Sequence, residues 1–182
     1  MQALDLLLKR QSCPRLEAPA PTADQLAQIL AAGMRVPDHG GLTPWQFIVA
    51  QDAGLTRLGD IFAAAASAAG GDEANITRAA QLPLRAPMVI TVAAKVQPHT
   101  KVPALEQQIA AGCAVMAMQQ AAFALGLGSI WRTGTYAFDR SVHEALELGG
   151  EDQIVGFLYV GTPVVKAPEK AAKSSDAVTR YL

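Results

Sequence analysis

The sequence is poor in charge, in aromatic side chains and in cysteine. Charged residues make up 17% of its 182 residues, aromatic residues make up 5%, and the formal net charge is −1. Such a chain has no basic field to hold nucleic acid or an anionic membrane, and few rings on which bases could stack. The two cysteines, Cys13 and Cys113, are too few for a disulfide framework, which favours a reducing setting. We therefore expect a cytoplasmic protein with neither nucleic-acid nor membrane partners.

The common nucleotide-binding and hydrolytic motifs are also missing. The chain has no GxxxxGK[ST] phosphate loop, no GxSxG nucleophile motif and no CxxC pair. Gly126 and Gly128 resemble half of a dinucleotide fingerprint, but they lie where a helix passes into a strand. The fingerprint needs the opposite order, so that a helix begins at the pyrophosphate. The two glycines therefore predict a helix end and a tight turn, and they disfavour a Rossmann dehydrogenase.

The histidines predict neither a metal site nor a hydrolytic site. His39, His99 and His143 are far apart in the chain, and none belongs to a closely spaced pair, so we expect no bound metal. Ser12 or Cys13 could be paired with His39 as a nucleophile, but Asp38 is adjacent to this histidine and is poorly placed to orient it. The position of His143 on an amphipathic helix predicts a solvated side chain.

The sequence is rich in hydrophobic residues, which make up 51% of the chain. No charged residue occurs between residues 109 and 131, which is long enough to be considered as a membrane span. Gln119 and Gln120 lie in the middle of this run and Gly112 interrupts it, so we expect a central helix of a folded core instead. Periodicity alone leaves open whether that helix is buried within one subunit or lies between two.

The hydrophobic pattern predicts one sheet between helices, within a single domain of residues 1–182. The clearest strand is residues 88–94, because a continuous apolar run is typical of a strand covered on both faces. Thr22 and Gln25 form a capping-box pattern at the start of a helix. We expect residues 178–182 to have β character and to pair with a sheet edge, either of this chain or of a partner. Further strands are predicted at 46–50, 129–134 and 153–160, and helices at 4–10, 23–36, 61–69, 73–80, 102–125 and 141–148.

Three arginines stand out as candidate ligands for a phosphate. Arg10 lies two residues before Ser12, Arg35 lies four residues before His39, and Arg132 follows Trp131. Each alone is compatible with an ordinary surface charge. Together they offer forked donors for a doubly charged phosphate and for the polar edge of a ring, although composition does not show that they converge.

The order and spacing of six segments resemble the flavin-dependent nitroreductases, in particular the compact bacterial NAD(P)H nitroreductase type. The segments are residues 7–12, 32–39, 44–47, 111–119, 128–134 and 154–161. The resemblance implies a three-layer α+β fold, with a mostly antiparallel sheet wrapped by helices. It also implies a homodimer with the long central helix at the interface and FMN shared between the subunits.

The resemblance also assigns residues to the cofactors by position. Those implied to contact FMN from one subunit are Arg10, Gln11, Ser12, Trp131, Arg132 and Thr133, and those supplied by the other subunit are Arg35 and His39. The segment implied to contact NADH or NADPH consists of Ala121, Ala122, Phe123, Ala124, Leu125 and Gly126. Gln11 stands where relatives commonly have a basic residue, and the loop at residues 40–43 departs from the wider family pattern. These departures leave the substrate preference open.

The implied reaction needs no catalytic acid or base from the protein. Hydride would pass from the nicotinamide to flavin N5, and an electron-poor acceptor such as a nitroaromatic would then take two electrons at the same place, in a ping-pong scheme. Arg10 or Arg132 would stabilise the reduced ring, and we expect a flat, apolar face for the acceptor. A flavin-dependent quinone reductase or dehydrogenase, and a non-catalytic flavin-binding protein, are the alternatives.

Overall fold

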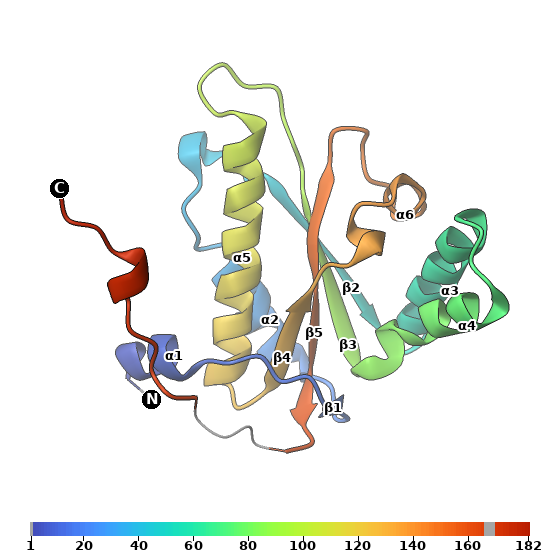
Figure 1. Cartoon of the computed structure of the whole chain (residues 1–182), viewed down its shortest axis with the longest axis horizontal. Helices are drawn as coiled ribbons and strands as arrows, with labels where there is room; N and C mark the ends of the chain where they lie inside the picture. The colour runs from blue at the N-terminus through green and yellow to red at the C-terminus, as the bar shows by residue number, and fades with distance from the viewer. Residues whose placement is uncertain (1, 166–169) are drawn as a thin grey trace.

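One antiparallel sheet runs through the middle of the molecule (Figure 1). The computed structural model describes residues 2–165 and 170–182. The helices are α1 (Ala3–Lys9), α2 (Ala23–Gly33), α3 (Ala53–Ala68), α4 (Glu73–Gln81), α5 (Ala104–Ala124) and α6 (Arg140–Ala145). The strands are β1 (Leu16–Glu17), β2 (Trp45–Gln51), β3 (Met88–Ala94), β4 (Gly128–Arg132) and β5 (Gln153–Pro163), and short 3-10 turns are η1 (His39–Gly41), η2 (Pro83–Arg85), η3 (Thr135–Ala137) and η4 (Asp176–Val178).

The long strand β5 organises the sheet. It pairs with β3 along one edge and with β4 and β1 along the other, and β2 completes the order β1-β5-β3-β2. Every pairing is antiparallel, with Met88 opposite Val160 on one side and Arg132 opposite Phe157 on the other. All seven residues of β3 are buried, which confirms the strand with both faces covered.

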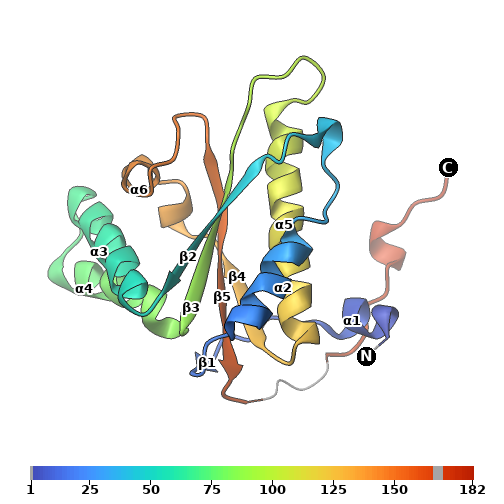
Figure 2. The ribbon, with the colours of Figure 1, turned by 180° about the vertical axis from the view of Figure 1, so that it is seen from behind.

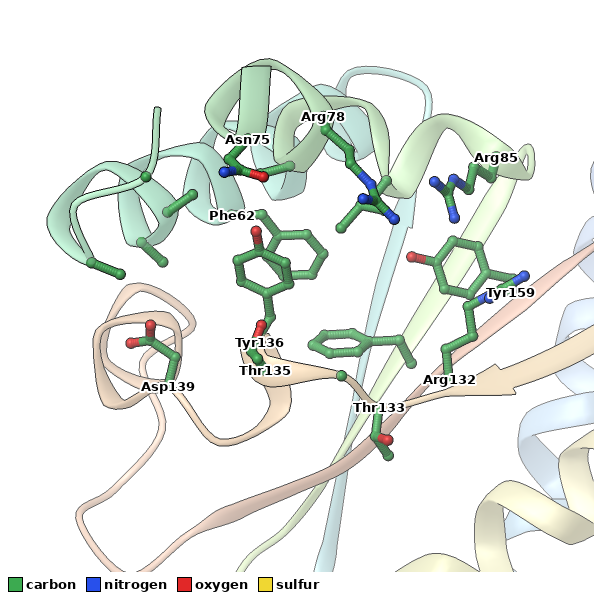
Figure 3. Close-up of a pocket in the computed structure, with 18 of the residues that line it drawn as sticks. Phe62, Asn75, Arg78, Arg85, Arg132, Thr133, Thr135, Tyr136, Asp139 and Tyr159 are labelled. Carbon is green, nitrogen blue, oxygen red and sulfur yellow. The ribbon is translucent and has the colours of Figure 1, made fainter. Parts of the chain in front are cut away.

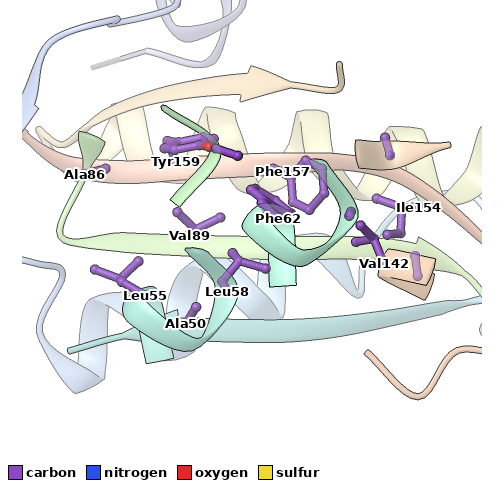
Figure 4. Packing of buried hydrophobic residues seen from close by; sticks show 14 of the residues in the cluster. Ala50, Leu55, Leu58, Phe62, Ala86, Val89, Val142, Ile154, Phe157 and Tyr159 are labelled. Carbon is purple, nitrogen blue, oxygen red and sulfur yellow. The ribbon is translucent and has the colours of Figure 1, made fainter. Parts of the chain in front are cut away.

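Helices cover both faces of the sheet, which confirms the three-layer α+β prediction. In Figures 1 and 2, α2 and α5 lie on one face, and α3, α4 and α6 lie on the other. Phe62 of α3 packs edge-on against Phe157 of β5 with ring centroids 5.2 Å apart (Figure 4). Met118 of α5 packs with Ile90 of β3 in the opposite layer. Burying one such side chain contributes about 1.5–3 kcal/mol relative to leaving it in water.

The local expectations for helix ends are largely confirmed. The Thr22 hydroxyl accepts a hydrogen bond from the Gln25 backbone at 3.2 Å, and the Gln25 side chain accepts one in return from Thr22 at 2.9 Å. Gly126 has a φ of 79° just after α5, as expected for a glycine that ends a helix. Helix α3 begins at Ala53, earlier than predicted, because Leu55 and Leu58 extend the buried face of Phe62 through the preceding turns.

Two expectations are wrong. His143 is buried, not solvated: its Nδ1 lies 2.7 Å from the Asp139 carbonyl oxygen, and its Nε2 accepts a 3.2 Å hydrogen bond from the Ile154 backbone. The ring therefore caps the start of β5, a tertiary role that no local pattern marks. Residues 178–182 are exposed and pair with no described strand of this chain, and Val178 ends the short turn η4, so pairing with an edge of this chain's own sheet is wrong. Pairing with a partner's edge stays a prediction.

Within residues 2–165 and 170–182, no helix combines the length and the apolar character that crossing a bilayer requires. Helix α5 instead buries one side against the sheet, through residues that include Ala111, Val115 and Met118. Leu105 and Ile109 lie on its other side and are more than half exposed.

Candidate functional site

A pocket of about 820 Å³ opens between the α3–α4 pair and the end of β4 (Figure 3). Small-molecule sites usually occupy about 300–1,000 Å³. One part of its wall is aromatic: Phe62 stacks on Tyr136 with ring centroids 4.5 Å apart and planes 12° apart, and Phe157 lies beside them. Phe62 and Phe157 are buried, so the half-buried Tyr136 is the ring of this trio that a flat ligand could contact.

The other part of the wall is cationic. Arg78 comes from α4, Arg85 from η2 and Arg132 from β4, and their side chains lie toward the Tyr159 end of the pocket (Figure 3). The guanidinium carbon of Arg132 is 5.9 Å from the centroid of the Tyr159 ring. In the part of the chain that the structure describes, no carboxylate forms an ion pair with any of the three arginines. These cations are therefore available to an anionic ligand.

Tyr159 places a phenol between these charges. Burial raises the pKa of Tyr159 above its usual value of 10.0, although the positive charges of Arg132 and Arg85 offset part of that effect. The hydroxyl is therefore protonated at neutral pH, and it can donate a hydrogen bond.

Strand alternation places Trp131 and Arg132 on opposite faces of β4. Arg132 points toward the pocket, whereas the Trp131 indole lies against Gly156 and donates a 3.1 Å hydrogen bond to the Val155 carbonyl oxygen. A Cβ at residue 156 would overlap this indole. Thr133 follows, and all three residues of this predicted segment contribute to the pocket wall, although the Trp131 indole points to the opposite face of the sheet.

Residues 10–12 run beside the start of β4, outside the pocket wall. The backbone N–H of Cys13 donates a 2.8 Å hydrogen bond to the Ser129 carbonyl oxygen, and the three steps from Ser129 to Arg132 span about 10 Å of strand. The Nε of Arg10 is buried and has no hydrogen-bond partner among the described residues. Because leaving a buried donor unpaired costs about 1–3 kcal/mol, an anion at this point would restore a missing interaction. Arg10 thus fits a phosphate, with the exposed Ser12 hydroxyl nearby in the chain.

Arg35 and His39 lie elsewhere, on the α2–η1 segment, and neither lines the pocket of its own chain. The His39 Nδ1 is 3.0 Å from a carboxylate oxygen of Glu106 in α5. The Asp38 carboxylate fixes the loop by accepting hydrogen bonds from the backbones of Leu42 and Thr43. The contribution of Arg35 and His39 to a second subunit's cofactor stays a prediction.

The segment predicted for NADH or NADPH forms the last turn of α5 and its cap. Ala122 is buried, and Gly126 follows the helix end. A helix C-terminus presents carbonyl oxygens and a negative dipole, and none of residues 121–126 has a charged side chain or lines the pocket. This assignment stays a prediction without support from the geometry.

Sequence reasoning assigned only residues 131–133 of the pocket wall and missed the rest, including the polar residues Asn75, Arg78, Arg85 and Tyr159. Tyr159 is a residue with a polar hydroxyl in an otherwise apolar, buried strand. That hydroxyl was the one feature of the sequence that could have indicated a site residue here. The arginines come from separate elements, and nothing local marks their convergence. Among the described residues, no group of three histidine, cysteine or acidic side chains could hold a metal ion.

Comparison with known proteins gives consistent matches. The model of the family described as "Nitroreductase family" matches residues 7–162. The chain is 50% identical over 167 residues to an Escherichia coli (strain K12) protein named "Putative NAD(P)H nitroreductase YdjA", covering 92% of this chain and 91% of that protein. A nitroreductase-like family protein from Bacillus cereus has a similar structure, with a TM-score of 0.86, 20% identity and coverage of 100% of this chain and 96% of that chain. A nitroreductase-family structure from Desulfovibrio desulfuricans, described as a complex with FMN, gives a TM-score of 0.75 at 22% identity over 98% of this chain and 96% of that chain.

Proposed function

The chain belongs to the nitroreductase family, and on that premise we propose that it is an FMN-dependent oxidoreductase. It takes hydride from NADH or NADPH and reduces nitroaromatic or related electron-poor acceptors by a ping-pong mechanism. The observation on which this rests is the pocket at the end of β4, where an aromatic wall meets three guanidinium groups, beside the unpaired buried donor of Arg10. The relatives' names support the donor and the cofactor.

The residues present fit FMN in both its parts. Arg10 and Ser12 would hold the phosphate, because a doubly charged anion satisfies the buried guanidinium donor. Trp131, Arg132 and Thr133 would hold the ring edge, about 10 Å further along β4. When bound, FMN supplies the two-electron redox chemistry. The task of Arg132 is then electrostatic, because a fixed cation stabilises negative charge that develops on a neighbouring ring.

Residues of this chain also provide the apolar surface and the hydrogen-bond donor of the proposed acceptor site. Tyr136 is half-buried and presents aromatic surface to an acceptor, while the buried rings of Phe62 and Phe157 pack behind it and hold it in place. Tyr159 offers a protonated hydroxyl as a hydrogen-bond donor. No side chain of the pocket is needed as a nucleophile.

We also propose that the active form is a homodimer built on α5. Leu105 and Ile109 are 64% and 56% exposed on this helix, and Leu4 and Leu8 of α1 are also exposed. Helix α1 lies beside the other, C-terminal end of α5 (Figure 2). A second copy would remove this apolar surface from water. It would also explain why Arg35 and His39 lie away from their own pocket. Since NADH and NADPH are cytoplasmic metabolites, we place the enzyme in the cytoplasm.

The decisive experiment is a spectrum followed by half-reactions. The purified protein should be yellow, with one FMN per chain, and anaerobic NADH or NADPH should bleach it. A nitroaromatic acceptor added after the donor is removed should restore the colour, and steady-state double-reciprocal plots should give parallel lines. Reoxidation by quinones alone would make it a quinone reductase. Tight FMN binding without bleaching would indicate a non-catalytic flavin-binding protein.

A further inference from the structure

Arg85 lies at the rim of the pocket, in a short turn that is anchored by buried residues on both sides. Its neighbours Pro83 and Ala86 are both buried, and its backbone N–H donates a hydrogen bond to the Leu82 carbonyl oxygen. The backbone is thus fixed, while the residue itself is exposed. In Figure 3 the guanidinium group extends toward Tyr159.

The end of the pocket at Arg85 has an uncompensated positive charge. The wall contains three arginines and one acidic residue, Asp139, a formal surplus of two positive charges (3 − 1), in a chain whose overall charge is −1. Asp139 lies at the opposite end, beyond Tyr136 (Figure 3), and its carboxylate caps α6 by accepting hydrogen bonds from Ser141. The cationic end therefore faces a ligand without a neutralising carboxylate among the described residues of the wall.

The proposed cofactor does not account for Arg85. A phosphate at Arg10 and a ring edge at Arg132 occupy the two cations nearest to β4, and Arg85 comes from a different element on the far side of Tyr159. Arg85 and Arg132 are the two cations whose charge acts on Tyr159. One aromatic wall, one phenol donor and two guanidinium groups that the cofactor does not use, Arg78 and Arg85, thus surround a single space. Of these two, Arg85 is the one whose charge acts on Tyr159.

We propose that Arg85 selects acceptors that have a carboxylate or another negative group attached to their aromatic ring. This rests on the proposed function and names its substrate class. The ring lies against the aromatic wall, and the anion accepts hydrogen bonds from Arg85 and from the Tyr159 hydroxyl. The extra phosphate of NADPH is a poor alternative, because two riboses and a pyrophosphate separate it from the nicotinamide ring.

The test compares 4-nitrobenzoate with 4-nitrobenzamide, which have the same ring and nitro group but differ in charge. With the FMN-loaded protein and a fixed concentration of NADPH, kcat/KM should be at least about tenfold higher for the carboxylate, the scale of one charge-assisted hydrogen bond. Arg85→Gln should remove this preference by lowering kcat/KM for the carboxylate far more than for the amide. Arg57→Gln, which changes an exposed arginine of α3 outside the pocket, should keep it.

A binding measurement separates this proposal from the proposed function. Benzoate, but not benzamide, should raise the melting temperature of the wild-type protein, and Arg85→Gln should abolish the shift. If no acceptor is turned over, the proposed function fails, yet the benzoate shift still tests Arg85. The proposal is overturned if the wild type does not discriminate between the two ligands, or if Arg85→Gln affects both alike. It is also overturned if that variant loses FMN affinity or changes only the ratio of NADPH to NADH use.

Discussion

The indole of Trp131 lies across Gly156, with its Nε1 donating a hydrogen bond to the carbonyl oxygen of Val155. The absence of a side chain at residue 156 is what allows the ring to lie flat on β5. The same contact fixes β4 against its partner strand, and through β4 it fixes the pocket residues Arg132 and Thr133.

Gly156→Ala should therefore disturb the site as well as the fold. The added methyl group overlaps the indole, and overpacking of this kind costs about 1–3 kcal/mol of unfolding free energy. Urea unfolding should show the loss, and the Trp131 fluorescence should shift as the ring becomes more exposed. Gly54→Ala is a suitable control, because its Cβ would meet only Ala50 at an ordinary 3.7 Å. An unchanged emission spectrum and stability for Gly156→Ala would contradict this account.

Tyr159 should give the protein an alkaline dependence of stability. Its pKa is raised by burial in the folded protein, so the folded state holds the phenol proton more tightly than the unfolded chain does. The stability that this contributes is complete below pH 10 and is lost as the pH rises through the folded-state pKa. Tyr159→Phe should flatten the fall in unfolding free energy between pH 9 and about 11. Tyr181→Phe, at a 91% exposed position, should keep the wild-type slope, and equal slopes for all three proteins would refute the assignment.

Asp152 should have the opposite, acidic dependence. Burial alone would raise the pKa of Asp152, but hydrogen bonds from the Lys95 ammonium group and from the backbones of Gly149 and Val96 outweigh it, so the net pKa is lowered. The resulting stability is present above the usual value of 3.8 and is lost as the pH falls below it.

Asp152→Asn should destabilise the protein by about 1–3 kcal/mol at neutral pH, because buried backbone donors lose a charged acceptor. Denaturant unfolding at pH 7 and at pH 3 measures this, and the difference between variant and wild type should shrink at the lower pH. The exposed Asp60 of α3 offers the control Asp60→Asn, which should change little. A deficit that is constant across the pH range would show that the charge of Asp152 is not responsible.

Arg10 should contribute to FMN affinity and should not contribute to the stability of the FMN-free protein. Arg10→Ala should weaken FMN binding by about 1.5–3 kcal/mol, the scale of a charge-assisted hydrogen bond. The FMN-free variant should be at least as stable as the FMN-free wild type, because the substitution removes a buried donor that has no partner among the described residues. Flavin fluorescence titration and melting curves measure the two effects. Arg15→Ala, at an exposed position in the same segment, is the control, and equal FMN affinities for both variants would remove Arg10 from the site.

Features that depend on neighbouring residues could be predicted from the sequence, whereas features that depend on distant ones could not. The capping box of Thr22 and the buried strand β3 are properties of short segments, and both were predicted. His143 was misassigned because the donor that it satisfies, the backbone of Ile154, belongs to another element. Two residues of β1 form a strand only because the end of β5 extends beyond β4.

In the candidate site, too, the residues that are neighbours in the sequence could be predicted, and those that come from distant segments could not. Residues 131–133 form one local segment that the family resemblance assigns as a unit, and they line the pocket together. Arg78, Arg85 and Tyr159 come from α4, η2 and β5, so only the folding of the α3–α4 pair over the sheet brings them into one wall. The expected flat, apolar acceptor face is thus only half of the pocket, and the cationic half emerges from tertiary structure.

The exposed side of α5 provides the test of the shared site. Ile109→Glu places a charge in the middle of the apolar surface that we propose a second copy covers, so sedimentation should change from dimer to monomer. If Arg35 and His39 act on the partner's cofactor, the monomer should also lose FMN affinity, even though its own pocket is intact. Phe138→Glu changes a 66% exposed apolar residue next to η3 and should remain dimeric with normal FMN binding. An Ile109→Glu monomer that binds FMN as tightly as the wild type would show that one chain holds the cofactor alone, and the roles given to Arg35 and His39 would then be wrong.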